Sequence, residues 1–202
     1  MTRTLVHLVR HGEVENPGRV LYGRLPGYHL SARGRRMAER LAEYFHGADL
    51  AAVTASPMER AQETAAPTAR DHGLEVRTDS RLIEAGNHFE GSTIGSNPRQ
   101  LLHPKYWGML LNPFLPSWGE SYESVARRMT AAVEAARDFA AGHEIVLVSH
   151  ELPVWTLRSS VEGRRLWHDP RRRECTLASV TTLAYHGKDL TSLTYVEPCA
   201  DL

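Results

Sequence analysis

The stretch LVRHGEVENPG, Leu8–Gly18, begins inside the apolar run TLVHLV and decides how the rest of the chain is interpreted. That run, Thr4–Val9, predicts a short buried strand. The strand leads at once into Arg10 and His11, two side chains that are both costly to remove from water, and then into a glycine. A strand end that carries such a pair indicates a binding site for an anion.

Strand and helix signals alternate along the rest of the sequence. Expected strands lie at 51–55, 75–78 and 145–148, and a hairpin is expected from strands at 177–185 and 190–196. Expected helices run from a Ser31 cap to about 46, from a Ser56 cap to about 72, from 120 or 121 to just before Gly142, and onward from 150 with Pro153 in the first turn. This order predicts an α/β fold, a three-layer α/β/α sandwich with a mostly parallel central sheet.

The alternation lapses between about residues 92 and 119. Four prolines, at 98, 104, 113 and 116, interrupt any long helix there, although a short helix at 100–111 is compatible with the sequence. We interpret 1–202 as a single domain with a surface excursion at about 92–119. Loops of this length often cover functional sites.

Composition and charge exclude several function classes. Lys plus Arg and Asp plus Glu both number 24 in 202 residues, so no overall field attracts nucleic acid or a membrane surface. No apolar stretch approaches about 18 residues, the length of a membrane span. Cys175 and Cys199 lie far apart, and the sequence has neither HExxH nor a Cys/His cluster. We therefore expect a cytoplasmic protein without a metal site.

Polar side chains gather where the expected strands end. Arg10 and His11 follow the first strand, Arg60 falls in the first turn after the second, and His150 follows the apolar strand at 145–148. Ligands of open parallel sheets bind outside the carboxyl ends of the strands, so we expect these four residues to converge. Two arginines, two histidines and a helix N-terminus suit a dianion, and phosphate fits best.

Several motifs together resemble one known family. LVRHGE, Leu30-Ser31-x-x-Gly34, SPMERAQETA, RLIEAGNHFEG, GES and VSH follow one another between about Leu5 and His150. Their order is similar to that of the histidine phosphatase superfamily, also called phosphoglycerate mutase-like.

The resemblance implies a role for each matched residue. His11 matches the nucleophile that becomes a phosphohistidine, and Arg10 and Arg60 match the phosphate-binding arginines. His150 matches the second histidine of the pocket, and Glu84 matches the carboxylate that serves as acid and base.

Two positions depart from the family pattern. Asn16 matches a further phosphate ligand, but it follows the nucleophile one position earlier than usual. Glu151 stands where the family's VSHG has glycine. Its carboxylate either repels phosphate or points outward and contacts the substrate, and the sequence leaves both readings open.

The resemblance implies an enzyme of the phosphoric monoester hydrolase class. We expect a metal-independent phosphatase without a cofactor, which takes a small phosphorylated substrate and releases inorganic phosphate. A phosphoglycerate-type mutase and a non-catalytic phosphate-binding regulatory protein on the same fold stay open as alternatives. The sequence also leaves open whether the chain forms a homo-oligomer, and it does not name the substrate.

Two further features are interpreted as surface. His88 lies four residues beyond Glu84 and is expected on the surface. The basic run Arg171–Arg173, with Arg164 and Arg165 upstream, is interpreted as a solvated face.

Overall fold

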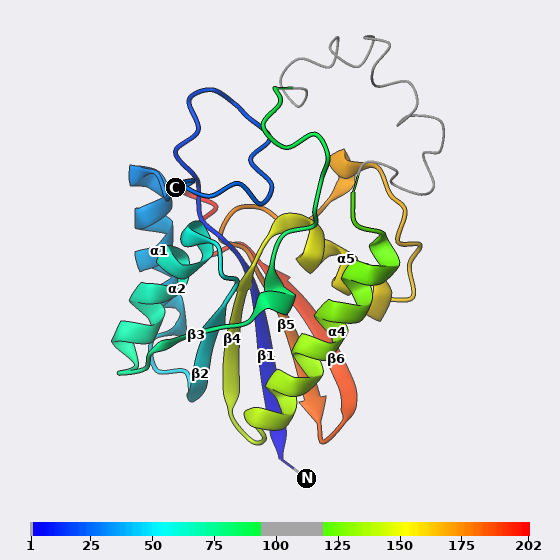
Figure 1. Cartoon of the computed structure of the whole chain (residues 1–202). Helices are drawn as coiled ribbons and strands as arrows, with labels where there is room; N and C mark the ends of the chain where they lie inside the picture. Colours follow the sequence, from blue (N-terminus) through cyan, green and yellow to red (C-terminus); the bar gives the residue numbers. More distant parts are fainter. Residues whose placement is uncertain (1, 94–118) are drawn as a thin grey trace.

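Figure 1 shows the computed structural model of the chain, which describes residues 2–93 and 119–202. The strands are β1 (Arg3–Arg10), β2 (Leu50–Ala55), β3 (Val76–Thr78), β4 (Glu144–Ser149), β5 (Val180–His186) and β6 (Asp189–Val196). The helices are α1 (Ala32–Phe45), α2 (Glu59–Asp71), α4 (Tyr122–Phe139) and α5 (Glu151–Val161), with 3₁₀ turns η1 (Ser80–Leu82) and η4 (Pro170–Arg172). Within those two ranges, no helix is both long and apolar enough to cross a membrane.

The six strands form one sheet in the order β3-β2-β4-β1-β5-β6. β3, β2, β4 and β1 run parallel, whereas β5 is antiparallel to β1 and pairs with β6 as the predicted hairpin. The register between β1 and β4 pairs Arg10 with Ser149. The residues that follow, His11 and His150, therefore leave the sheet side by side at its carboxyl edge.

Helices cover both faces of the sheet, which confirms the predicted three layers: α4 and α5 lie on one face, and α1 and α2 on the other (Figure 1). Successive side chains of a strand point to opposite faces, and β4 shows the consequence. Ile145 and Leu147 belong to the core beneath α4 and α5, whereas Val146 and Val148 belong to the core beneath α1 and α2. A wholly apolar strand is what burial on both faces requires.

The predicted Ser31 cap of α1 is confirmed, the predicted Ser56 cap of α2 is wrong, and Ser121 caps α4. Ser31 and Ser121 accept hydrogen bonds from backbone amides three residues on, as N-caps do. The second helix, however, begins at Glu59, with Met58 at the N-cap position and no side-chain cap. Ser56 lies before the helix, and its hydroxyl is 3.4 Å from the Met58 amide and 2.8 Å from Nε2 of His150.

The predicted excursion falls almost wholly outside the described residues, as does the short helix predicted at 100–111. Its flanks meet, because Asn87 and Gly119 form an isolated antiparallel bridge. A Cβ atom at Gly119 would lie 2.3 Å from the carbonyl oxygen of Gly86, so this approach requires glycine. The bridge brings Glu120 next to the segment that carries Glu84, since the Glu120 amide donates to the same carbonyl.

Candidate active site

Two histidines from different strand ends meet at the carboxyl edge of the sheet. The rings of His11 and His150 lie edge to face, with centroids 5.1 Å apart and planes inclined by 63°. Both side chains are almost completely buried, at 2% and 0% exposure. The convergence predicted from the sequence is confirmed, and it follows from the parallel pairing of β1 with β4.

His11 is held in one tautomer and kept neutral. Its Nδ1 lies 2.8 Å from the carbonyl oxygen of Gly12, a pure acceptor, so Nδ1 carries the proton and Nε2 carries the lone pair. Burial, followed by the charges of Arg60 and Arg10, lowers the pKa of His11 to about 3, against the smaller raising effect of the Gly12 carbonyl. A neutral imidazole with a defined lone pair is the form that a nucleophile requires.

Arg60 is a fully buried cation from the first turns of α2. Its Nη2 donates to the carbonyl oxygen of Gly23 at 2.6 Å, and its guanidinium carbon lies 4.8 Å from the centroid of the Tyr22 ring. The Tyr22 ring also stands edge-on to that of His11, with centroids 6.4 Å apart. The segment that carries Tyr22 and Gly23 therefore fixes the arginine beside the nucleophile.

Several buried polar atoms around these residues lack partners within the described part of the chain. They are Nε of Arg10, Nε and Nη1 of Arg60, and Nδ1 of His150. An unsatisfied buried donor is destabilising by about 1–3 kcal/mol, and more when it is charged, so such atoms in a native fold require an explanation. A phosphate dianion beside His11 would supply acceptor oxygens for them.

Glu84 contributes a carboxyl group close to the charges of Arg60 and Arg10. Burial raises the pKa of Glu84, against the opposing effects of the Ala85 amide, which donates to Oε1 at 2.9 Å, and of the charges of Arg60 and Arg10. Nε of Arg24 donates to the Glu84 carbonyl at 2.7 Å and holds the backbone in place. A carboxyl with a raised pKa is suited to donate a proton and to take it back.

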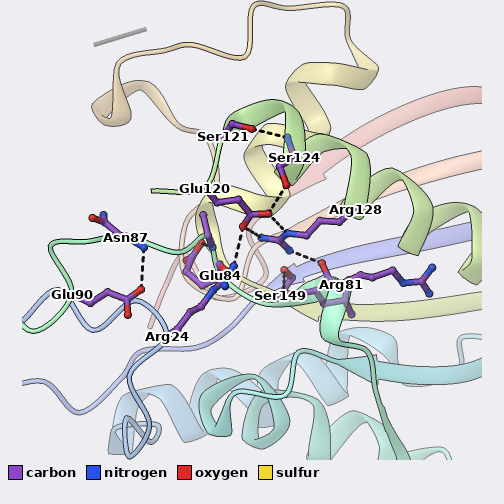
Figure 2. Close-up of polar contacts among 12 residues, drawn as sticks. Arg24, Arg81, Glu84, Asn87, Glu90, Glu120, Ser121, Ser124, Arg128 and Ser149 are labelled. Carbon is purple, nitrogen blue, oxygen red and sulfur yellow. Dashed lines mark hydrogen bonds and ion pairs between the residues drawn. The ribbon is translucent and has the colours of Figure 1, made fainter. Parts of the chain in front are cut away.

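A network centred on Glu120 supports that segment (Figure 2). Its carboxylate accepts from Nη2 of Arg24 at 2.9 Å, from Nε of Arg128 at 3.0 Å and from the hydroxyl of Ser124 at 3.0 Å. Arg128 in turn donates to the carbonyl oxygen of Arg81 at 2.5 Å. Side chains from three parts of the chain thus fix the backbone at residues 81–84.

The candidate catalytic residues open onto a cavity of about 440 Å³. Its lining includes Arg10, His11, Tyr22, Glu84, Glu120, Tyr122, Glu151 and Arg173. His150 and Arg60 lie behind this lining, in contact with His11 and Tyr22 respectively. The five core residues named from the sequence therefore form one cluster.

Glu151 does not point outward, and whether it repels phosphate stays a prediction. Its carboxylate lies within the cavity, with Oε2 2.9 Å from Nη2 of Arg10 and Oε1 3.1 Å from Nη1 of Arg173. The interpretation of Arg173 as part of a solvated face is therefore wrong, although Arg171 and Arg172 are exposed as expected. A run of arginines in sequence does not reveal which of them a turn directs inward.

Asn16 is occupied elsewhere. Its amide group donates to the carbonyl of Val20 at 2.9 Å, and its oxygen accepts from the Val20 amide at 3.0 Å. This pair of hydrogen bonds closes the turn before Tyr22, and Asn16 does not belong to the cavity lining. Its role as a phosphate ligand stays a prediction. His88 is exposed, as expected.

No group of three or more His, Cys, Asp or Glu residues is placed to hold a metal ion in the described ranges. The guanidinium groups of Arg10 and Arg60 supply positive charge beside His11. The sequence did not predict Ser56, Tyr22 or Arg173 as site residues. Their local patterns do not reveal such a role, because each reaches the site through a long-range contact.

Comparison with known proteins agrees with this architecture. The family model of the histidine phosphatase superfamily (branch 1) matches residues 6–198. The chain belongs to this superfamily.

Two curated relatives cover most of the chain. It is 56% identical over 197 residues to protein Rv0525 of Mycobacterium tuberculosis (strain H37Rv), with 98% of each chain covered. It is 33% identical over 189 residues to a probable phosphoglycerate mutase, GpmB, of Yersinia enterocolitica, which covers 87% of this chain and 83% of that one.

Solved structures have the same fold. YhfR of Bacillus stearothermophilus is 27% identical and superposes with a TM-score of 0.79 over 93% of this chain and 94% of that one. The native mycobacterial glucosyl-3-phosphoglycerate phosphatase is 25% identical, with a TM-score of 0.73 and 91% of each chain covered. The fold is thus phosphoglycerate mutase-like.

Proposed function

We propose that the protein is a metal-independent phosphatase that hydrolyses a small phosphomonoester through a phosphohistidine at His11. The observation that carries this proposal is the set of buried unpartnered donors on Arg10, Arg60 and His150 around a neutral imidazole. Membership of the superfamily and the likeness to a named phosphatase support the same reaction class.

In the first step, Nε2 of His11 attacks phosphorus and the bond from phosphorus to the leaving oxygen breaks. The Glu84 carboxyl gives its proton to the leaving alkoxide and becomes a carboxylate. In the second step, that carboxylate takes a proton from water as the water oxygen attacks phosphorus. The P–N bond then breaks, and phosphate and neutral His11 are released.

The arginines stabilise the charge that spreads over the three equatorial oxygens of the transferring group. Arg60 is fixed by Gly23 and Tyr22, so its guanidinium needs little reorganisation during reaction. Fixed donors in a site shielded from water stabilise developing charge more than mobile ones do. Nδ1 of His150 adds a neutral donor when Nε2 accepts from the Ser56 hydroxyl.

The proposal is tested by replacing the nucleophile. We expect the wild-type protein to release phosphate steadily from p-nitrophenyl phosphate in EDTA, and His11→Ala to lose at least about 10³-fold in kcat. Rapid quenching should trap an acid-labile, base-stable phosphoenzyme in the wild type. His88→Ala is the matched control, since that histidine is exposed. Activity that survives in His11→Ala, or that depends on added metal, would overturn the assignment.

The alternative function, a phosphoglycerate-type mutase, is also tested, because one relative is named a probable phosphoglycerate mutase. The wild type is incubated with 3-phosphoglycerate and a bisphosphoglycerate primer, and isomerisation is compared with phosphate release. We expect release to exceed isomerisation. The reverse result would show that a second substrate molecule, and not water, accepts the phosphoryl group. The role of His11 as nucleophile would be unchanged.

A further inference from the structure

Glu151 forms a bridge between two arginines at the phosphate end of the cavity. It is the first residue of α5, directly after His150, and its two carboxylate oxygens contact Arg10 and Arg173 separately. A carboxylate is favoured at a helix N-terminus, where backbone amides point toward it. Glu151 therefore places a fixed negative charge beside an arginine that is proposed to bind phosphate.

Arg173 is anchored in place and does not move as a loose surface cation. Its Nε donates to Nε2 of His168 at 2.8 Å, while Nδ1 of His168 donates to the carbonyl oxygen of Leu166 at 2.6 Å. The His168 ring packs against Trp155 and Tyr122, with centroids 5.8 and 5.5 Å away. Burial lowers the pKa of His168, which keeps Nε2 available as an acceptor.

The charges of these groups match one phosphate dianion. Arg10, Arg60 and Arg173 contribute three positive charges and Glu151 one negative charge. The Glu84 carboxyl is neutral when it is protonated, as the first step requires. The sum at this end of the cavity is thus two positive charges, which one dianion neutralises. A second anionic group on the substrate would meet Glu151 with no charge left to offset it.

We propose that Glu151 and Arg173 form a charge pair that sets substrate selectivity, so that the enzyme prefers phosphomonoesters whose leaving group is uncharged. The inference rests on the proposed phosphatase function and goes beyond it by naming the substrate class. Glu151 weakens the hold of Arg10 on phosphate and repels a carboxylate or second phosphate on the leaving group. Arg173 limits this repulsion by neutralising most of the Glu151 charge.

The pair is tested by a double-mutant cycle on phosphate affinity. We expect Glu151→Gln, which keeps the shape and removes the charge, to bind inorganic phosphate about tenfold more tightly by calorimetry. Arg173→Gln leaves the Glu151 charge unpaired, and we expect about tenfold weaker binding. The double variant should return to within about threefold of wild type. A structural defect would weaken binding in every variant.

Selectivity is tested with two substrates that differ in one charge. Glycerol 3-phosphate and 3-phosphoglycerate carry a hydroxymethyl group and a carboxylate at the same position. We expect the wild type to favour glycerol 3-phosphate by at least about tenfold in kcat/KM, and Glu151→Gln to reduce this preference to about threefold or less. Glu162→Gln is the matched control, because Glu162 also bridges two arginines, Arg158 and Arg164, at the far end of α5.

The outcomes separate this inference from the proposed function. Weaker phosphate binding by Glu151→Gln would show that Glu151 orients Arg10 and would overturn the inference. An unchanged substrate preference in that variant would do the same. If the wild type binds phosphate but hydrolyses neither ester, the proposed function fails, and the selectivity inference falls with it. The calorimetric cycle would still measure the charge coupling.

Discussion

The hydroxyl of Ser56 lies 2.8 Å from Nε2 of His150, although 94 residues separate the two along the chain. Ser56 follows β2 and His150 follows β4, and these strands are neighbours in the sheet. Both side chains are completely buried. The serine therefore orients the imidazole and leaves Nδ1, which has no partner within the described residues, for another ligand.

Removal of this hydroxyl should impair catalysis without unfolding the protein. We expect Ser56→Ala to lower kcat/KM for p-nitrophenyl phosphate by roughly tenfold, because His150 loses the contact that orients its ring and a buried nitrogen loses its partner. Ser160→Ala, at an exposed position of α5, is the control and should keep wild-type activity. Equal activity of the two variants would show that His150 needs no such support.

The loss of activity caused by replacing Glu84 should depend on the leaving group of the substrate. We expect Glu84→Gln to lower kcat by about 10²–10⁴-fold for an alkyl phosphate, whose alkoxide needs a proton as it departs. The decrease in the rate of the first step should be much smaller for p-nitrophenyl phosphate, since p-nitrophenolate departs without a proton. Single-turnover rates of phosphoenzyme formation measure this step alone. Equal losses for the two esters would assign Glu84 a different role.

The neutral state of His11 should make the fold sensitive to acid. Its pKa is lowered to about 3 in the folded protein, against an ordinary 6.5, so between these values only the unfolded chain binds the proton. The contribution of His11 to the free energy of unfolding is complete above pH 6.5. It is lost as pH falls toward 3, by about 1.4 kcal/mol per pH unit. Urea unfolding at pH 7.5 and 5.0 should therefore show a loss about 2 kcal/mol larger in wild type than in His11→Gln.

His88→Gln serves as the control for that comparison, because it replaces an exposed histidine outside the site. Identical pH dependence of wild type and His11→Gln would mean that His11 titrates normally in the fold.

Gly34→Ala should destabilise the protein, although alanine is the better helix former. A Cβ atom at Gly34 would lie 2.0 Å from the carbonyl oxygen of Glu13, which belongs to the loop after the nucleophile. We expect a loss of about 2 kcal/mol or more in the free energy of unfolding, together with lower activity. Gly18→Ala is the control, since its nearest neighbour would be a Val20 methyl group at 3.4 Å. A stabilised Gly34→Ala variant would contradict this packing.

The sequence predicted that the candidate residues converge, because its signals are local. Arg10 ends β1, and His11 and His150 directly follow β1 and β4, whose parallel strands end at a common edge. Arg60 was placed by the motif SPMERAQETA, whose early turn faces the same edge. Glu84 was located through the resemblance, since no strand end precedes it directly.

The predicted cap at Ser56 was wrong. A serine before Pro57 has the local features of an N-cap, but the helix begins later, at Glu59, and the Ser56 hydroxyl contacts His150. A local sequence pattern predicts contacts between residues that are close in the chain, whereas His150 follows another strand, β4. The same limit explains why Arg173 was assigned to the solvent with its neighbours.

The sequence by itself determined the layers of this protein, the direction of its strands and the side chains that stand at their carboxyl ends, because hydrophobic periodicity and turn chemistry are read within one segment. Only the tertiary structure decided that Glu151 lies between Arg10 and Arg173, and that Ser56 contacts His150. Contacts of this kind depend on the strand register and on the path of distant loops, which no single stretch of sequence specifies.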